Sequence, residues 1–242
     1  MASGYVPTYV RGLDELLGGG IPKGNVVLFT GTPGARKTSL VYHILHHNAK
    51  EGRRGLFIAL EQGERDLRAG MRQLGLDGLS EKKLYVMDTV ALRAELEEQE
   101  TEKDWPAIMR YVIKESVEGD RRQLIALDSL DVLYAIGGLV NPRRELFHFF
   151  NFLRDLGQTT LLISEIPVGG TRLGRFGEDF LADGVFLLRH YDVGETGVQL
   201  RLRCVKMRRT HHEEGYFALD RDPNGFYVTN VMSRQGEHLL RR

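Results

Sequence analysis

A glycine-rich segment near the N-terminus combines the residue types that bind a polyphosphate. Residues 31–39 (GTPGARKTS) follow an apolar, β-branched run at 25–30 and precede a segment whose apolar residues recur at helical spacing. In that order, backbone N–H groups and the helix N-terminus enclose phosphates, a lysine neutralises the β and γ oxygens, and the next hydroxyl binds Mg²⁺. Lys37 and Thr38 stand at the last two positions. We predict that phosphates are bound by Gly31, Thr32, Pro33, Gly34, Ala35, Arg36, Lys37, Thr38 and Ser39.

One residue of this segment departs from the usual pattern. The arrangement G-x-x-x-x-G-K-[ST] has become G-x-x-x-x-R-K-T, with Arg36 in place of the last glycine. Glycine there permits an unusual φ and a close approach of the ligand. The arginine could weaken binding, or it could contact a phosphate or a neighbouring subunit. An ordinary glycine turn before a basic helix start is the alternative interpretation.

Acidic residues follow three of the predicted strands. A continuous apolar run ends in Asp128, the run after the glycine-rich segment is followed by Glu61, and a third run ends in Ser164-Glu165. Open α/β sheets bind ligands at the carboxyl ends of their strands. We predict that Asp128 holds Mg²⁺ through water and that Glu61 orients or deprotonates the attacking water. Two alternatives remain open: Glu61 could cap the next helix, and Glu165 could either sense the γ-phosphate or begin a loop.

Strand-like and helix-like segments alternate along most of the chain. Predicted strands at 25–30, 55–60, 83–87, 123–128 and 159–164 are separated by helical patterns, including 105–117 and 143–156. This alternation predicts an α/β fold with a mainly parallel central sheet flanked by helices. After Asp183 only strand-like runs follow, so we expect antiparallel strands at one edge of the sheet. We predict a single domain over 1–242, with an exposed acidic segment at 93–104 and a loose tail from about 232 to 242.

Composition excludes several classes of protein. Lys and Arg (33) balance Asp and Glu (33), which argues against a surface devoted entirely to nucleic acid or membrane. No run approaches the roughly 20 apolar residues of a membrane helix, and the N-terminus lacks a signal-peptide core. The single cysteine, Cys204, cannot form an intramolecular disulfide. We therefore expect a cytoplasmic protein without membrane partners.

Motifs along nearly the whole chain, from about Val6 to Val228, resemble those of the KaiC-like branch of the RecA-type ATPases. They are GLDELLGGGIPKGNVVLFTGTPGARKT, IALEQ, LIALDSL, TTLLISEIP, RFGEDFLADGVFLL and KMRRTHH. The resemblance implies a RecA-like P-loop fold that binds ATP and Mg²⁺ and hydrolyses ATP in a homo-oligomeric ring, a hexamer, with sites at subunit interfaces. It also implies that Lys206 and Arg208 reach the γ-phosphate bound by the adjacent subunit, with His212 following them at the nucleotide.

The chain departs from this family pattern at several of the matched positions. Arg36 and Arg209 stand where the family has glycine, Gln62 replaces the second of two acidic residues, and His211 replaces a small hydroxyl residue. Arg36 puts turnover in doubt more than binding. A second hypothesis is therefore an ATP-binding regulatory or assembly module with little turnover, and a protein client is compatible with either.

A third hypothesis is a recombinase-related ATPase that binds single-stranded DNA. Two loops, 136–144 and 167–176, carry arginines that could contact a phosphate backbone, namely Arg143, Arg144, Arg172 and Arg175. Phe176 is the one aromatic residue available for base stacking there, so plain surface loops are the favoured interpretation. The basic strand 201–212 could likewise be a charged edge strand or a nucleic-acid patch. Metal binding by the adjacent His pairs is not favoured, and His43 and His47 fit a solvated helix face.

Overall fold

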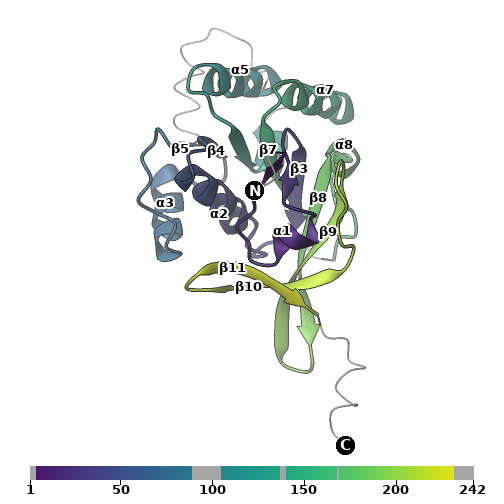
Figure 1. Cartoon of the computed structure of the whole chain (residues 1–242). Helices are drawn as coiled ribbons and strands as arrows, with labels where there is room; N and C mark the ends of the chain where they lie inside the picture. Colours follow the sequence, from purple (N-terminus) through teal and green to yellow (C-terminus); the bar gives the residue numbers. More distant parts are fainter. Residues whose placement is uncertain (1–3, 89–104, 137–139, 168, 232–242) are drawn as a thin grey trace, which may run out of the picture.

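The apolar runs of the chain form one large sheet. The computed structural model describes residues 4–88, 105–136, 140–167 and 169–231, and in them nine strands pair in the order β11-β10-β9-β8-β3-β7-β6-β4-β5 (Figure 1). The strands from β8 to β5 are parallel, and β9, β10 and β11 continue the sheet antiparallel at one edge. Their bounds are β3 Val26–Gly31, β4 Gly55–Ala59, β5 Leu84–Asp88, β6 Leu124–Asp128, β7 Thr159–Glu165, β8 Gly184–Val193, β9 Gly197–Met207, β10 Tyr216–Asp222 and β11 Gly225–Asn230. The predicted mainly parallel sheet with added antiparallel strands is confirmed.

Helices cover both faces of this sheet. In Figure 1, α5 and α7 lie together above the sheet, whereas α2 and α3 lie on its other side. The helices are α1 Leu13–Leu16, α2 Lys37–Lys50, α3 Glu64–Gln73, α5 Trp105–Glu118, α6 Leu130–Ile136, α7 Pro142–Asp155 and α8 Glu178–Leu181. The short helices α1, α6 and α8, and a small sheet of β1 Tyr5–Val6 with β2 Ile21–Pro22, were not predicted, because they are too short to show a period. The acidic segment 93–104, the tail 232–242 and residues 137–139 of one proposed DNA loop lie outside the described residues.

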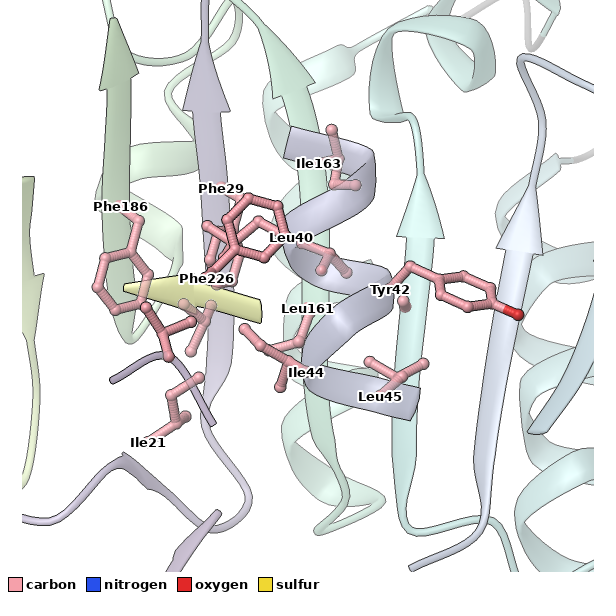
Figure 2. Packing of buried hydrophobic residues seen from close by; sticks show 14 of the residues in the cluster. Ile21, Phe29, Leu40, Tyr42, Ile44, Leu45, Leu161, Ile163, Phe186 and Phe226 are labelled. Atoms are coloured by element: carbon pink, nitrogen blue, oxygen red, sulfur yellow. The ribbon is translucent and has the colours of Figure 1, made fainter. Parts of the chain in front are cut away.

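Alternate side chains of the central strands enter two separate cores. On β3, Val27 and Phe29 pack in the core that contains α2, while Val26 and Leu28 pack in the core that contains α5 and α7. A strand buried on both faces is expected to be apolar throughout, which explains the continuous apolar runs of the sequence. Figure 2 shows the α2 side, where apolar side chains of the helix meet those of the sheet: Leu40, Ile44, Leu45, Phe29, Leu161 and Ile163. This packing fixes the start of α2 at the end of β3.

His43 and His46 of α2 are buried and His47 is half-buried, so the expectation of a solvated helix face is wrong for His43. His43 and His46 are each only 1% exposed. His43 Nε2 lies 3.0 Å from the Tyr9 carbonyl oxygen, and its ring packs edge-on against Phe226 of β11. The N-terminal segment and the C-terminal hairpin therefore cover a helix face that looked polar in the sequence. Neither ring nitrogen of His46 has a hydrogen-bond partner among the described residues.

Burial of these histidines predicts a loss of stability in mild acid. Burial lowers the pKa of His43 and of His46 to about 4, so the unfolded chain takes up protons before the folded one. The free energy of unfolding should fall as the pH falls from about 6.5 to 4, by about 3 kcal/mol for each histidine. Urea unfolding at pH 7 and at pH 5 measures this loss. Between these two pH values, the free energy of unfolding should fall less in a His46→Leu variant than in the parent. Equal losses in the two proteins would contradict this origin.

Candidate nucleotide-binding site

The predicted phosphate segment forms a tight loop between β3 and α2. Gly31 ends β3 so close to β8 that a Cβ there would lie 2.1 Å from the Leu188 carbonyl oxygen, so only glycine fits. Lys37 is the first residue of α2 and is 6% exposed. Its Nζ donates to the carbonyl oxygens of Gly31 at 3.1 Å and Thr32 at 3.0 Å. The ammonium group is therefore held over the loop, where phosphate oxygens would bind.

Thr38 and Asp128 meet across the sheet edge, ninety residues apart in the chain. Thr38 Oγ1 donates to Asp128 Oδ2 at 2.7 Å, and Asp128 Oδ1 is buried with no partner among the described residues. Burial raises the pKa of Asp128 to about 6, against the hydrogen bond from Thr38, which lowers it. A buried carboxylate oxygen without a donor, beside a hydroxyl, suits a hard cation. The residues present therefore fit Mg²⁺.

Glu61 lies beside the same pocket and does not cap α3. Its Oε1 accepts a hydrogen bond from Oγ of Ser129, the residue after Asp128. The first turn of α3 is capped instead by Asp88, whose Oδ2 accepts from the Glu64 backbone N–H at 3.0 Å. Glu61 is exposed, as a group that acts on water must be. Sequence reasoning missed Ser129, although its place directly after Asp128 was a usable signal.

A cavity of about 340 Å³ joins these side chains. It is lined by Gly34, Ala35, Arg36, Lys37, Thr38, Ser39, Glu61, Asp128, Ile163 and Glu165. Glu165 Oε1 accepts from Lys37 Nζ at 3.3 Å, and the Glu165 backbone N–H donates to Asp131 Oδ2 at 2.7 Å. Most of the predicted phosphate and Mg²⁺ residues thus border one cavity, together with Glu61. Neither the ion pair with Glu165 nor the contact of Asp131 was predicted.

Arg36 and Arg209 keep the backbone conformation that glycine would adopt. Their φ angles are 59° and 70°, in the left-handed region that costs a side-chain-bearing residue about 1–2 kcal/mol. Arg36 is exposed, precedes α2, and lines both the phosphate cavity and a second cavity of about 390 Å³ beside β8, β9 and β10. Arg209 Nη2 donates to Asn25 Oδ1. The backbone at these two positions therefore keeps the left-handed conformation that glycine would adopt, although both residues are arginine.

Lys206 and Arg208 lie near the amino ends of the parallel strands, whereas the phosphate loop of the same chain lies at their carboxyl ends. The Arg208 backbone N–H donates to the Asp183 carbonyl oxygen, and Asp183 in turn bonds Val26 at the start of β3. Gly31 is five residues further along β3, a separation of about 17 Å. Neither side chain can reach the phosphates of its own chain, so only a second subunit could bring them to a nucleotide.

Lys206 lies in β9, whereas Arg208 lies in the turn that follows, because β9 ends at Met207. The continuous strand expected over 201–212 is therefore wrong beyond Met207. Lys206 Nζ donates to the carbonyl oxygens of Asp179, Phe180 and Ala182, and burial lowers its pKa. Arg208 pairs with Asp183 at 3.1 Å, but its side chain is 51% exposed. Arg208 is therefore the more available of the two. His212 lies in an irregular segment between β9 and β10, and one of its ring nitrogens, Nε2, is buried without a partner among the described residues.

The arginines of the suggested DNA loops have different surroundings. Arg143 lies in α7 and donates to the Phe176 carbonyl oxygen at 3.1 Å, so it links the helix to the second loop. Arg144 also lies in α7 and is exposed. Arg172 and Arg175 are exposed and line a cavity of about 700 Å³ that adjoins the phosphate cavity at Glu165. DNA binding stays a prediction.

Comparison with known proteins agrees with this geometry. The sequence model for the ATPase KaiC matches residues 6–232. The chain belongs to the KaiC family of ATPases. It is thus a nucleotide-binding protein of the RecA superfamily, as the resemblance of its motifs predicted. Within the described residues, none of the helices is long and apolar enough to cross a membrane.

Relatives in this family include both short and long proteins. The chain is 31% identical to a UPF0273 protein of Aeropyrum pernix, over 86% of each chain. It is 29% identical to the circadian clock protein KaiC3 of Synechocystis, but spans only 42% of that protein. Its fold is similar to the crystal structure of a KaiC-like protein from Pyrococcus horikoshii, with a TM-score of 0.78 at 28% identity, covering 93% of this chain and 99% of that one.

Proposed function

We propose that this KaiC-family chain is one domain that binds Mg·ATP and hydrolyses it within a homo-oligomeric ring, a hexamer with composite sites. The observation that carries the proposal is the convergence of Lys37, Thr38, Asp128 and Glu61 on one cavity. Residues 31–39 bind the phosphates through backbone N–H groups, and Lys37 neutralises the β and γ oxygens. Thr38 and Asp128 would hold Mg²⁺, which would offset the negative charge of the phosphates.

Glu61 is the general base in this proposal. Its exposed carboxylate takes a proton from the attacking water, while the hydrogen bond from Ser129 fixes its orientation. Lys206, Arg208 and His212 of one subunit lie against the nucleotide of the next. Arg208 is placed at the γ-phosphate, where its charge stabilises the transition state. Hydrolysis by an isolated chain is then slow, because Arg208 lies far from the phosphate loop of its own chain.

A Lys37→Ala variant tests the proposal. We expect Mg·ATP binding to weaken by at least about 100-fold, because a buried ammonium that pairs directly with the phosphates is worth roughly 3 kcal/mol or more. Titration calorimetry measures the binding, and phosphate release and mass with and without Mg·ATP measure turnover and assembly. Lys114→Ala, an exposed lysine of α5, is the matched control. Unchanged ATP binding and hydrolysis in Lys37→Ala would overturn the proposal.

Arg36 supports a second candidate function, an ATP-dependent assembly module with little turnover. The exposed guanidinium at the mouth of the phosphate cavity, on a left-handed backbone, distinguishes this chain from the glycine pattern of the motif. An Arg36→Gly variant should unfold at higher denaturant, with a gain of about 1 kcal/mol from relief of the backbone conformation. If Arg36 limits catalysis, the same variant should release phosphate faster at unchanged ring mass. A faster rate would mean that Arg36 limits turnover in the parent, which favours the assembly module. An unchanged or slower rate would favour the ATPase.

A further inference from the structure

Glu165 borders two cavities at the carboxyl edge of the sheet. In the phosphate cavity of about 340 Å³, its carboxylate accepts a hydrogen bond from Lys37 Nζ at 3.3 Å. The adjoining cavity, of about 700 Å³, is lined by Asp131, Glu165, Pro167, Gly170, Thr171, Arg172, Gly174 and Arg175. A carboxylate shared by both can respond to a ligand that enters either one.

The ion pair between Lys37 and Glu165 conflicts with a bound triphosphate. A γ-phosphate uses the same ammonium group, and it would carry its negative charge into contact with the Glu165 carboxylate. Like charges in contact cost several kcal/mol in a partly buried setting. The side chain of Lys37 is 6% exposed whereas that of Glu165 is 39% exposed. Glu165 is therefore the partner that can move.

The adjoining cavity offers the displaced carboxylate two cations. Arg172 and Arg175 are exposed, line this cavity with Glu165, and form no ion pair with any other residue in the described ranges. The backbone of the segment that carries them is held by two other side chains. Arg189 donates to the Gly170 carbonyl oxygen at 2.7 Å, and Thr30 Oγ1 donates to the Leu173 carbonyl oxygen at 2.9 Å. These anchors hold the main chain and engage neither guanidinium group. The Arg175 guanidinium lies over the Phe176 ring, 5.3 Å from its centroid, a contact that Arg175 would give up to reach Glu165.

The main chain of Glu165 stays in place during such a change. Its N–H donates to Asp131 Oδ2 at 2.7 Å, and Ser164 Oγ, one residue earlier, donates to Thr30 Oγ1 at 3.1 Å. Thr30 also holds Leu173 and directly precedes Gly31 of the phosphate loop. A movement of the Glu165 side chain alone would therefore connect the phosphate loop to the arginine-bearing segment.

We propose that Glu165 is a positioning residue that exchanges Lys37 for Arg172 or Arg175 when a nucleoside triphosphate binds. The inference rests on the proposed function, because it needs ATP at Lys37. Breaking the ion pair lowers the affinity for ATP, and pairing with the arginines restores part of it. Because the conflict arises at the γ-phosphate, ADP should leave the pair with Lys37 largely intact.

Calorimetric titration of the full chain with Mg·ATP and Mg·ADP tests the first half of the exchange. Glu165→Gln should bind ATP about tenfold more tightly than the parent, within the usual range of coupling between sites, while its affinity for ADP changes little. Glu115→Gln, an exposed carboxylate of α5, is the control and should match the parent. Equal changes for ATP and ADP, or no change for either, would overturn the exchange.

A double-mutant cycle tests the second half. Replacing both Arg172 and Arg175 by Gln should weaken ATP binding several-fold in the parent, and should have little effect when Glu165 is already Gln. Additive effects would sink the proposal. Thermal unfolding establishes that each variant folds. If the variant without the two arginines does not fold, backbone hydrogen exchange of residues 170–176 replaces the cycle. ATP should slow this exchange in the parent but not in Glu165→Gln.

The two hypotheses fail differently in these titrations. If neither the parent nor Glu165→Gln binds ATP, the proposed function fails, and the exchange falls with it. If both proteins bind ATP with equal affinity, and Lys37→Ala does not, the proposed function stands and the exchange alone is wrong.

Discussion

An Arg208→Ala variant should still assemble and bind Mg·ATP, but its turnover should fall by about 10³-fold or more. The expected size is that of arginines supplied to a phosphoryl group by a neighbouring subunit. Folding should survive, because Asp183 keeps its ion pair with Arg154 at 3.2 Å when Arg208 is removed. Phosphate release by the assembled protein is the measurement. Arg72→Ala, whose side chain is 74% exposed on α3, is the matched control and should hydrolyse ATP like the parent.

Mixing two inactive variants distinguishes action between subunits from action within one chain. Arg208→Ala retains an intact phosphate loop, and Lys37→Ala retains an intact Arg208. In a random equal mixture, about a quarter of the sites should combine a working loop with a working Arg208 from the neighbour, provided that the interfaces are head-to-tail. Recovered hydrolysis in the mixture supports a composite site. If the mixture stays as inactive as its components, Arg208 does not act across an interface.

The parts of the site that could be predicted are those encoded by contiguous residues. Strand, loop and helix follow one another at residues 26–50, so the position of Lys37 over the loop is set locally. Asp128 was predictable because an apolar strand that ends in a carboxylate, in a parallel sheet, must end at the same edge. The left-handed backbone at Arg36 is the conformation that the glycine of the motif permits, although it was not predicted for an arginine. Local order and sheet direction together explain these successes.

The parts that could not be predicted depend on contacts between distant segments. Whether Glu165 faces Lys37 or begins a loop depends on how the end of β7 is placed against the start of α2, 128 residues away in the chain. His43 looked polar on a helix, but Tyr9 and the C-terminal hairpin cover it. Lys206 was expected to reach the γ-phosphate bound by an adjacent subunit, yet its ammonium group donates to three carbonyl groups around α8. Side-chain period gives the face of a strand or helix but not what covers that face.

A Glu61→Gln variant should bind Mg·ATP with nearly unchanged affinity and hydrolyse it about 10²- to 10⁴-fold more slowly. The amide keeps the shape of the side chain but cannot accept a proton from water, and general-base catalysis typically contributes a factor of this size. Binding should persist because the phosphate contacts assigned to Lys37 and Thr38 remain. Glu64→Gln, a carboxylate paired with Arg68 on the next helix, is the control. Hydrolysis by Glu61→Gln at the parental rate would remove Glu61 from the mechanism.

Ser129 makes it possible to separate the charge of Glu61 from its orientation. Ser129→Ala removes the hydroxyl that donates to Glu61 Oε1 but leaves the carboxylate able to accept a proton. Turnover should then fall by less than in Glu61→Gln, and the loss should disappear when Ser129→Ala is combined with Glu61→Gln, because a side chain that no longer acts as a base gains nothing from being oriented. If instead the two losses multiply, Ser129 acts on the reaction independently of Glu61. The hydrogen bond between them would then reflect only the packing of adjacent strand ends.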